Sequence, residues 1–210
     1  MKEKFFQNKL ALITLLSACG IVAVSMGLRQ TFGLFSDFFV KDLECTVTQF
    51  GLAIGIQMLM WGMFAPIFGA MADKYGPARV CLAGGLFYIL GLLLMAGFLN
   101  PATLVIGQIL VGMALASAGM SVALGAVAKV APKEKTGIAL GLVTAIGSFG
   151  QFMMLPFSQA LLSNFGWQLA YVVLAICIAF VTVFSFGLRV PKGQRTSSVE
   201  LADTITARQA

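Results

Sequence analysis

The stretch Gly69-Ala-Met-Ala-Asp73-Lys-Tyr-Gly76-Pro-Ala-Arg79-Val80 is a short charged turn between two long apolar runs. Residues 50–72 before it and residues 80–99 after it contain no charged side chain. Glycine followed by proline interrupts helical backbone, so the turn is expected to end one helix and begin another. Asp73 and Arg79 flank the turn and are placed to form an ion pair. A turn this short holds no soluble domain, so we expect it to lie at a membrane surface.

The composition is typical of a membrane protein. Hydrophobic residues make up 59% of the 210 residues and charged residues 10%, whereas soluble domains carry about 25% charged residues. The net charge of +6 does not indicate nucleic-acid binding, because the basic residues lie in short clusters that leave no basic face for a phosphate backbone. No nucleic-acid partner is therefore predicted.

Histidine is absent, which removes His-based nucleophile pairs and His-ligated metals. The four cysteines form no CxxC motif, so we predict no metal site, no disulfide framework and no cofactor. Cys45 lies outside the apolar runs and is expected to be exposed. No pair of acidic residues lies inside an apolar run, which argues against an intramembrane enzyme.

Six apolar runs each reach the roughly 20 residues that a helix needs to cross a bilayer. The predicted fold class is therefore all-α, a polytopic membrane protein with six transmembrane helices. An N-terminal segment, residues 1–9, precedes a transmembrane domain, residues 10–188, and a polar tail, residues 189–210, follows it. The predicted spans are residues 10–39, 50–72, 80–99, 102–128, 137–162 and 168–188.

The basic residues predict an orientation. Twelve of the 14 lysines and arginines fall in the N-terminal segment, the 73–79 turn, the 129–135 loop and the tail, which alternate with less basic loops. By the positive-inside rule both termini are cytoplasmic, and we predict a multi-pass protein of the cytoplasmic (inner) cell membrane. Trp167 and Tyr171 lie near a span end and fit an interfacial aromatic belt, while Trp61 and Tyr88 are interpreted as packing residues.

The charged turn resembles the loop between the second and third helices of the major facilitator superfamily, whose pattern is roughly G-x-x-x-D-[RK]-x-G-x-[RK]-[RK]. Gly69, Asp73, Lys74, Gly76 and Arg79 match this pattern, whereas two residues after Gly76 depart from it. The resemblance covers all six spans and implies a 3+3 repeat, half of a twelve-helix fold. It also implies that this turn gates the cytoplasmic side by contacting the other half.

Three further stretches are similar to the monocarboxylate and oxalate/formate transporter group of that superfamily. They are Gly27-Leu-Arg29-Gln-Thr-Phe32-Gly33-Leu-Phe35, Gly147-Ser-Phe-Gly150-Gln151 with Pro156, and Phe165-Gly166-Trp167. Members of the family have twelve spans, so the chain is interpreted as an N-terminal half. It is a fragment, a truncated frame or a half that pairs with a second copy, and we favour the fragment. The expected partners are the lipid bilayer, a small organic anion, and the missing C-terminal half or a second copy.

Polar residues inside the spans are few, and they are the candidates for substrate binding. Arg29 is the only basic residue within a span, and its planar guanidinium fits a carboxylate with two hydrogen bonds. Ser25 and Ser36 are expected on its helical face. An amide in hydrocarbon costs free energy unless it is paired, and pairing with a neighbouring helix explains such residues as well as substrate binding does. The neutral candidates are Gln57, Gln151 and Ser117, and Gln108 is a further polar residue within a span.

These features predict the N-terminal half of a secondary transporter for small organic anions, in which two halves rock around a midplane site. A carrier for another substrate class, such as drugs or sugars, is the alternative within the same family. A second class is a non-transporting membrane scaffold or remnant. For Arg29, the rival interpretation is that its side chain snorkels to the outer surface.

Overall fold

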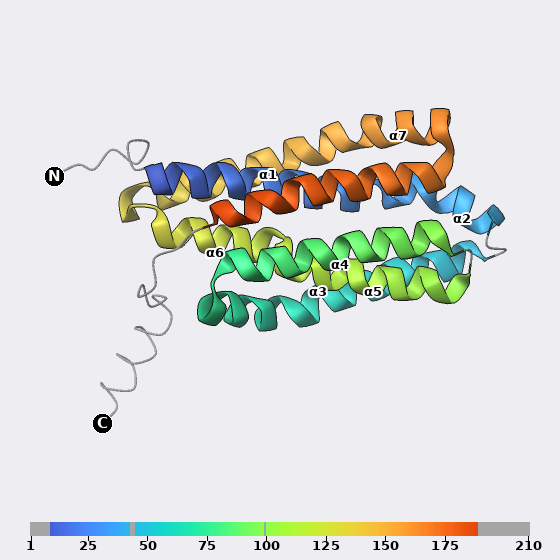
Figure 1. The fold of residues 1–210 in the computed structure, drawn as a ribbon, viewed down its shortest axis with the longest axis horizontal. Coiled ribbons are helices and arrows are strands. Elements are labelled where there is room, and N and C mark those ends of the chain that lie inside the picture. The colour runs from blue at the N-terminus through green and yellow to red at the C-terminus, as the bar shows by residue number, and fades with distance from the viewer. Residues whose placement is uncertain (1–8, 43–44, 99, 189–210) are drawn as a thin grey trace, which may run out of the picture.

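The computed structural model describes residues 9–42, 45–98 and 100–188, and every regular element in these ranges is a helix (Figure 1). The predictions for residues 1–8 and for the tail from residue 189 lie outside the described residues. The elements are α1 Lys9–Thr31, η2 Phe32–Phe35, α2 Ser36–Asp42, α3 Val47–Tyr75, α4 Pro77–Gly97, α5 Pro101–Ala118, α6 Met120–Val130, η3 Lys133–Lys135, α7 Thr136–Thr182 and η4 Val183–Gly187.

The helices make six crossings, as the sequence predicts. Five segments are long and apolar enough to span a membrane, and the last of them, Lys133–Gly187, contains 55 residues. That segment folds back on itself at Gly166, whose φ of 77° and ψ of 168° are not helical. Figure 1 shows α7 running the length of the bundle in both directions. The fifth crossing therefore precedes Gly166 and the sixth follows it.

The bounds of the crossings differ from the prediction, most clearly in the first, second and fourth. The first crossing does not stop at residue 39 but continues to Asp42, and a 3-10 turn, Phe32–Phe35, interrupts it. The second begins at Val47 rather than at residue 50, and it extends to Tyr75. The fourth is broken at Gly119, where the backbone is extended between α5 and α6. Apolar length marks a span but does not locate such breaks.

The start of α3 explains one of these differences. Thr46 forms a capping box with Gln49: the Gln49 backbone N–H donates to Thr46 Oγ1 at 3.2 Å, and the Thr46 N–H donates to Gln49 Oε1 at 2.8 Å. Cys45 precedes this cap, and the expectation that it is exposed is wrong. Its side chain is buried and its thiol donates to the Phe39 carbonyl at 3.3 Å.

The turn that opens the hairpin between α3 and α4 is as short as predicted. Gly76 has a φ of 94°, which glycine adopts without strain, and its N–H donates to the Ala72 carbonyl at 3.0 Å. Pro77 occupies the first position of α4, where a missing N–H leaves no helical hydrogen bond unmade. We call the end of the bundle that holds this turn, Lys129 and Lys133 the basic end, and the opposite end the Asp42 end.

Close contacts between crossings follow a two-fold pattern. Gly27 of the first crossing meets the fifth, where an added Cβ would lie 2.7 Å from the Gly150 carbonyl oxygen. Gly112 of the fourth meets the second, where an added Cβ would lie 2.7 Å from Met60 Cβ. If the first crossing is exchanged with the fourth and the fifth with the second, the contact between crossings one and five becomes the contact between crossings four and two. This exchange is the one that a 3+3 repeat requires.

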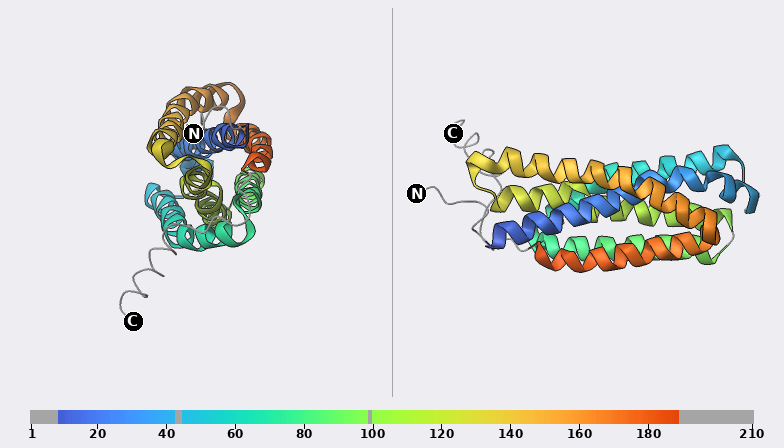
Figure 2. Two further views of the ribbon diagram at one scale, coloured as in Figure 1. Left: turned by 90° about the vertical axis from the view of Figure 1, so that its left-hand side faces the viewer. Right: turned by 90° about the horizontal axis from the view of Figure 1, so that it is seen from above.

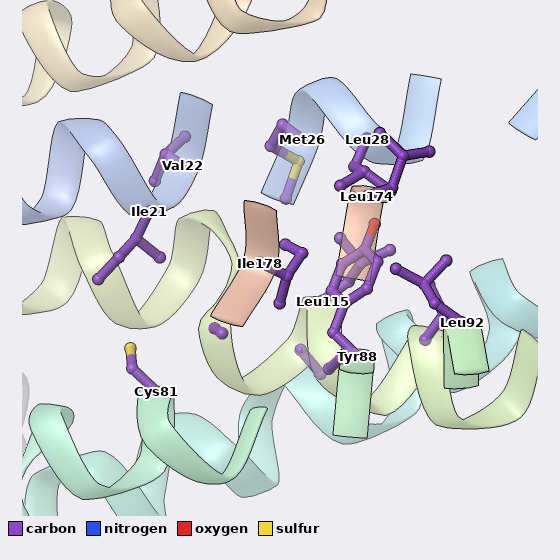
Figure 3. Packing of buried hydrophobic residues seen from close by; sticks show 14 of the residues in the cluster. Ile21, Val22, Met26, Leu28, Cys81, Tyr88, Leu92, Leu115, Leu174 and Ile178 are labelled. Atoms are coloured by element: carbon purple, nitrogen blue, oxygen red, sulfur yellow. The ribbon is translucent and has the colours of Figure 1, made fainter. Parts of the chain in front are cut away.

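The core lies between the first, third, fourth and sixth crossings. Figure 3 shows Leu28, Tyr88, Leu115 and Leu174 converging there, and Figure 2 shows their helices side by side along the bundle. Trp167 and Tyr171 also belong to the interior, so their assignment to an interfacial belt is wrong. Both are buried, and the ring of Phe39 packs against each of them, with centroids 4.8 Å from Trp167 and 5.6 Å from Tyr171.

Candidate functional site

Arg29 lies near the middle of the first crossing. That crossing extends from Lys9 to Asp42, so Arg29 is thirteen residues from its end, about 20 Å at 1.5 Å per residue. The side chain is half-buried. Its depth follows from the continuation of the helix beyond residue 39, which the sequence prediction did not include.

The guanidinium of Arg29 reaches across to α3. Its central carbon lies 5.2 Å from the ring centroid of Trp61, and Nη1 lies 3.7 Å from Met58 Sδ. A cation above an indole face is attracted by the ring quadrupole, and a thioether sulfur is a weak acceptor. Among residues 9–42, 45–98 and 100–188, Arg29 has no acidic partner. The site therefore holds a cation at mid-depth with its hydrogen-bonding capacity largely unused.

Gln57 precedes Met58 on α3 and lies one helical turn from Trp61. Its side chain is buried, with 1% of its surface exposed, and neither amide atom has a hydrogen-bond partner within the described part of the chain. Gln108 of α5 is in the same condition. An unpaired amide in an apolar interior is costly, so both amides have capacity for a ligand or for water. The structure thus brings Gln57 to the same region of α3 as the Arg29 contacts.

For Gln151 and Ser117, the structure shows no contact with Arg29. Gln151 is half-buried and follows Gly150, the residue at which the fifth crossing touches the first. Ser117 is fully buried, and its hydroxyl donates to the Met113 carbonyl at 2.8 Å. A Cβ added at Gly84 would collide with Ser117 Oγ, so this hydroxyl faces α4. The expected shared face of Ser25, Arg29 and Ser36 is also interrupted, because the 3-10 turn separates Ser36 from the other two.

The turn at the basic end carries a second group of charged residues. Asp73, the single acidic residue of α3, forms an ion pair with Lys129 near the end of α6. The expected pair between Asp73 and Arg79 is therefore wrong. Asp73 and Arg79 are both exposed, and Asp73 contacts Lys129 of the fourth crossing instead of Arg79. Lys74 lies 5.1 Å from the ring centroid of Tyr75, and Gly69 is half-buried one turn before Asp73.

Trp61, Met58 and Lys129 are site residues that the sequence analysis did not select. Trp61 was interpreted as packing and Lys129 as one of several basic residues in a loop. A signal for Trp61 existed, because a lone intramembrane cation needs a partner and an indole at mid-span provides one. No signal for Lys129 existed in the sequence, since its pairing depends on how the second and fourth crossings pack.

The fold and the site together define a class: a multi-pass helical membrane protein with six crossings and a cation held at mid-depth. In the described residues, no group of three or more metal-ligating side chains is present. A family profile described as Major Facilitator Superfamily matches residues 11–208. The chain belongs to the major facilitator superfamily, a family of membrane transporters and not of enzymes.

The chain is similar to proteins that are named for different substrates. It is 26% identical to the glucose transporter GlcP of Staphylococcus epidermidis over 70% of this chain and 33% of that protein. It is 29% identical to the class H tetracycline resistance protein of Pasteurella multocida over 83% and 42% of the two chains. It is 27% identical to monocarboxylate transporter 13 of Rattus norvegicus over 74% and 36%.

A solved structure shares the fold. The xylose transporter XylE from E. coli, in an inward-open conformation, matches with a TM-score of 0.67 at 14% sequence identity. The match covers 90% of this chain and 48% of XylE. The chain thus spans less than half the length of each of these relatives. The predicted fold, half of a twelve-helix bundle, is confirmed.

Proposed function

We propose that this chain is the N-terminal half of a secondary transporter for small organic anions, working by alternating access. One observation carries the proposal: Arg29 lies near mid-depth, is held over Trp61, and has no acidic partner in the described residues. An arginine at the bilayer centre costs roughly 2.5–3.5 kcal/mol on insertion scales, so a ligand that compensates its charge is favoured there. A carboxylate would accept two hydrogen bonds from its guanidinium.

The rival interpretation of Arg29, snorkelling to the outer surface, is disfavoured by the direction of its side chain. A snorkelling side chain extends along its own helix toward the nearer surface. The Arg29 guanidinium instead lies above Trp61 and beside Met58, both on α3. Gln57 then supplies a neutral donor next to this contact, and Gln151 is the second candidate donor. Ser117 is the weakest candidate, because its hydroxyl faces α4.

A sugar or drug carrier is the second candidate function. The names of two relatives, a glucose transporter and a tetracycline resistance protein, favour it. The buried amides of Gln57 and Gln108 would suit hydroxyl groups as well as carboxylates. In this case Arg29 would bind a substrate hydroxyl, and transport would not require a negative charge on the substrate.

The experiment uses the chain joined to a second six-helix half and compares Arg29→Lys with Arg29→Gln. Carboxylate binding predicts that Arg29→Gln abolishes uptake of organic anions, whereas Arg29→Lys only weakens it because the charge remains. Uptake of a neutral substrate by the parent carrier, weakened but not abolished by Arg29→Gln because the amide still donates to a hydroxyl, would favour the sugar or drug carrier. Parent uptake of the anion by Arg29→Gln would overturn the proposal.

The proposed setting is the cytoplasmic membrane, with both termini and the basic end on the cytoplasmic side. The partners are the lipid bilayer, the substrate anion and a second half, either a C-terminal six-helix unit or a second copy of this chain. A non-transporting scaffold would retain the bundle but would not need Arg29. The comparison of Arg29 variants therefore also separates a carrier from a scaffold.

A further inference from the structure

We infer that a groove at the Asp42 end binds a phospholipid with a primary-amine headgroup. The groove has a volume of about 650 Å³ and lies between the end of α4 and the bend of α7. Leu93 and Ala96 of α4 and Leu169 and Val172 of α7 give it apolar walls, and Gln168 is a neutral polar residue in the lining. Among the described residues that line it, Asp42 is the one with an acidic side chain.

Asp42 is held in place but has no cationic partner. Its carboxylate accepts a hydrogen bond from Nε1 of the buried Trp167, which fixes the side chain at the rim of the groove. Asp42 itself is exposed, and no salt bridge to it occurs in the described residues. A carboxylate accepts several hydrogen bonds, so one from Trp167 leaves further capacity. An ammonium group, which carries a positive charge and three N–H donors, is the complementary ligand.

The surface beyond the groove identifies a lipid rather than a soluble amine. Leu86, Leu90 and Leu93 are exposed on α4 at helical spacing. On the second part of α7, Leu169, Ile176 and Phe180 are exposed in the same way. These two stripes continue the apolar walls of the groove along the bundle, in the direction that an acyl chain follows from its headgroup. A small soluble amine would have no use for this surface.

Tryptophan fluorescence tests the inference, because the chain has only two tryptophans. The full chain carrying Trp61→Phe retains Trp167, whose fluorescence reports on the groove. The purified protein is reconstituted in phosphatidylcholine vesicles containing phosphatidylethanolamine, phosphatidylcholine or phosphatidylglycerol with brominated acyl chains, which quench nearby tryptophan. We expect brominated phosphatidylethanolamine to quench most strongly. Equal quenching by the three lipids would overturn the inference.

Two variants separate the headgroup contact from the acyl contact. Asp42→Asn should lower the preference for phosphatidylethanolamine over phosphatidylglycerol about fivefold, which corresponds to about 1 kcal/mol. Asp37→Asn is the matched control, since Asp37 is exposed on the same short helix but does not line the groove. Ala96→Phe should lower quenching by all three lipids, because it fills the groove. An equal loss of preference in both aspartate variants, or unchanged quenching with Ala96→Phe, would contradict the inference.

Discussion

At the residue scale, the site depends on an arginine whose partners are an aromatic ring and a thioether. A cation–π contact contributes about 0.5–2 kcal/mol, less than the cost of placing the charge in the bilayer. The contacts to Trp61 and Met58 therefore orient the guanidinium without fully compensating it. Arg29 has no acidic partner in the described residues, so a carboxylate ligand would supply the remaining compensation of its charge.

Replacing Trp61 tests this account. Trp61→Leu removes the ring that holds the guanidinium, so the affinity for the substrate anion should fall roughly twofold to thirtyfold in a carrier completed with a second half. Trp61→Phe keeps an aromatic face and should retain most of the affinity. Binding is measured by the substrate-dependent protection of the protein against thermal unfolding. Parent affinity in Trp61→Leu would show that the ring does not position Arg29.

Tyr88 provides a residue-scale prediction about stability. Its hydroxyl is buried and donates to the Ser25 carbonyl at 3.2 Å, joining α4 to α1. Tyr88→Phe should lower the free energy of unfolding by about 0.6 kcal/mol, the average for side-chain hydrogen bonds measured in a helical membrane protein. Unfolding in mixed detergent micelles measures the change. Tyr75→Phe is the control, because Tyr75 is exposed, and an equal loss there would contradict the assignment.

At the scale of elements, apolar length predicted the six crossings, and glycine with proline predicted the hairpin between α3 and α4. The breaks at Phe32–Phe35 and Gly119 were not predictable, because neither contains the glycine–proline pair that marks the hairpin. Arg29 could be selected as a candidate because a charge within a span stands out, and its role in substrate binding stays a prediction. Its contact with Trp61 and the pairing of Asp73 with Lys129 depend on helix packing, which a single sequence does not specify.

The bend of α7 gives the element-scale prediction. Gly166 has a φ of 77° and a ψ of 168°, a conformation that is almost restricted to glycine. Gly166→Ala should therefore destabilise the protein by about 1–3 kcal/mol and weaken the packing of the sixth crossing. Gly141→Ala is the control, because Gly141 is helical and a Cβ there meets nothing within 4 Å. Thermal unfolding should separate the two, and an equally stable Gly166→Ala would contradict the prediction.

At the scale of the whole molecule, the ion pair between Asp73 and Lys129 joins the second crossing to the fourth at the basic end. Asp73 is half-exposed, with 50% of its side chain accessible, so it also remains open to a partner outside this chain. We expect Asp73→Asn to slow transport in a completed carrier while leaving substrate binding and membrane abundance largely intact. Lys129→Gln separates the two contacts, because it removes the internal partner and keeps the Asp73 charge.

If the gate acts through a second half, Lys129→Gln should slow transport less than Asp73→Asn does. Counterflow in proteoliposomes measures the rate, and equilibrium binding measures the affinity. Equal slowing by both variants would show that the internal ion pair is the element that matters. A joint fall in binding and abundance would show that Asp73 is structural.

The final prediction is that this polypeptide alone does not transport. In the most apolar stretch of α3 only 17% of the residues are buried, whereas 61% are buried in the corresponding stretch of the first crossing. In α3 and in the first part of α7, side chains such as Leu59, Met63, Phe149 and Phe152 are exposed. A midplane site bordered by these helices is open on one side, so it cannot be closed alternately to the two aqueous phases.

Uptake by liposomes that contain only this chain tests the prediction. The expected result is no saturable uptake and no counterflow of any organic acid, even though the chain is folded and inserted. Joining a second six-helix half should restore counterflow, since it supplies the other wall of the site and the outside partner of Asp73. Saturable counterflow by the chain alone would contradict the prediction. Cross-linking of the active preparation would then distinguish a pair of copies from a single one, because only a pair could close the open side.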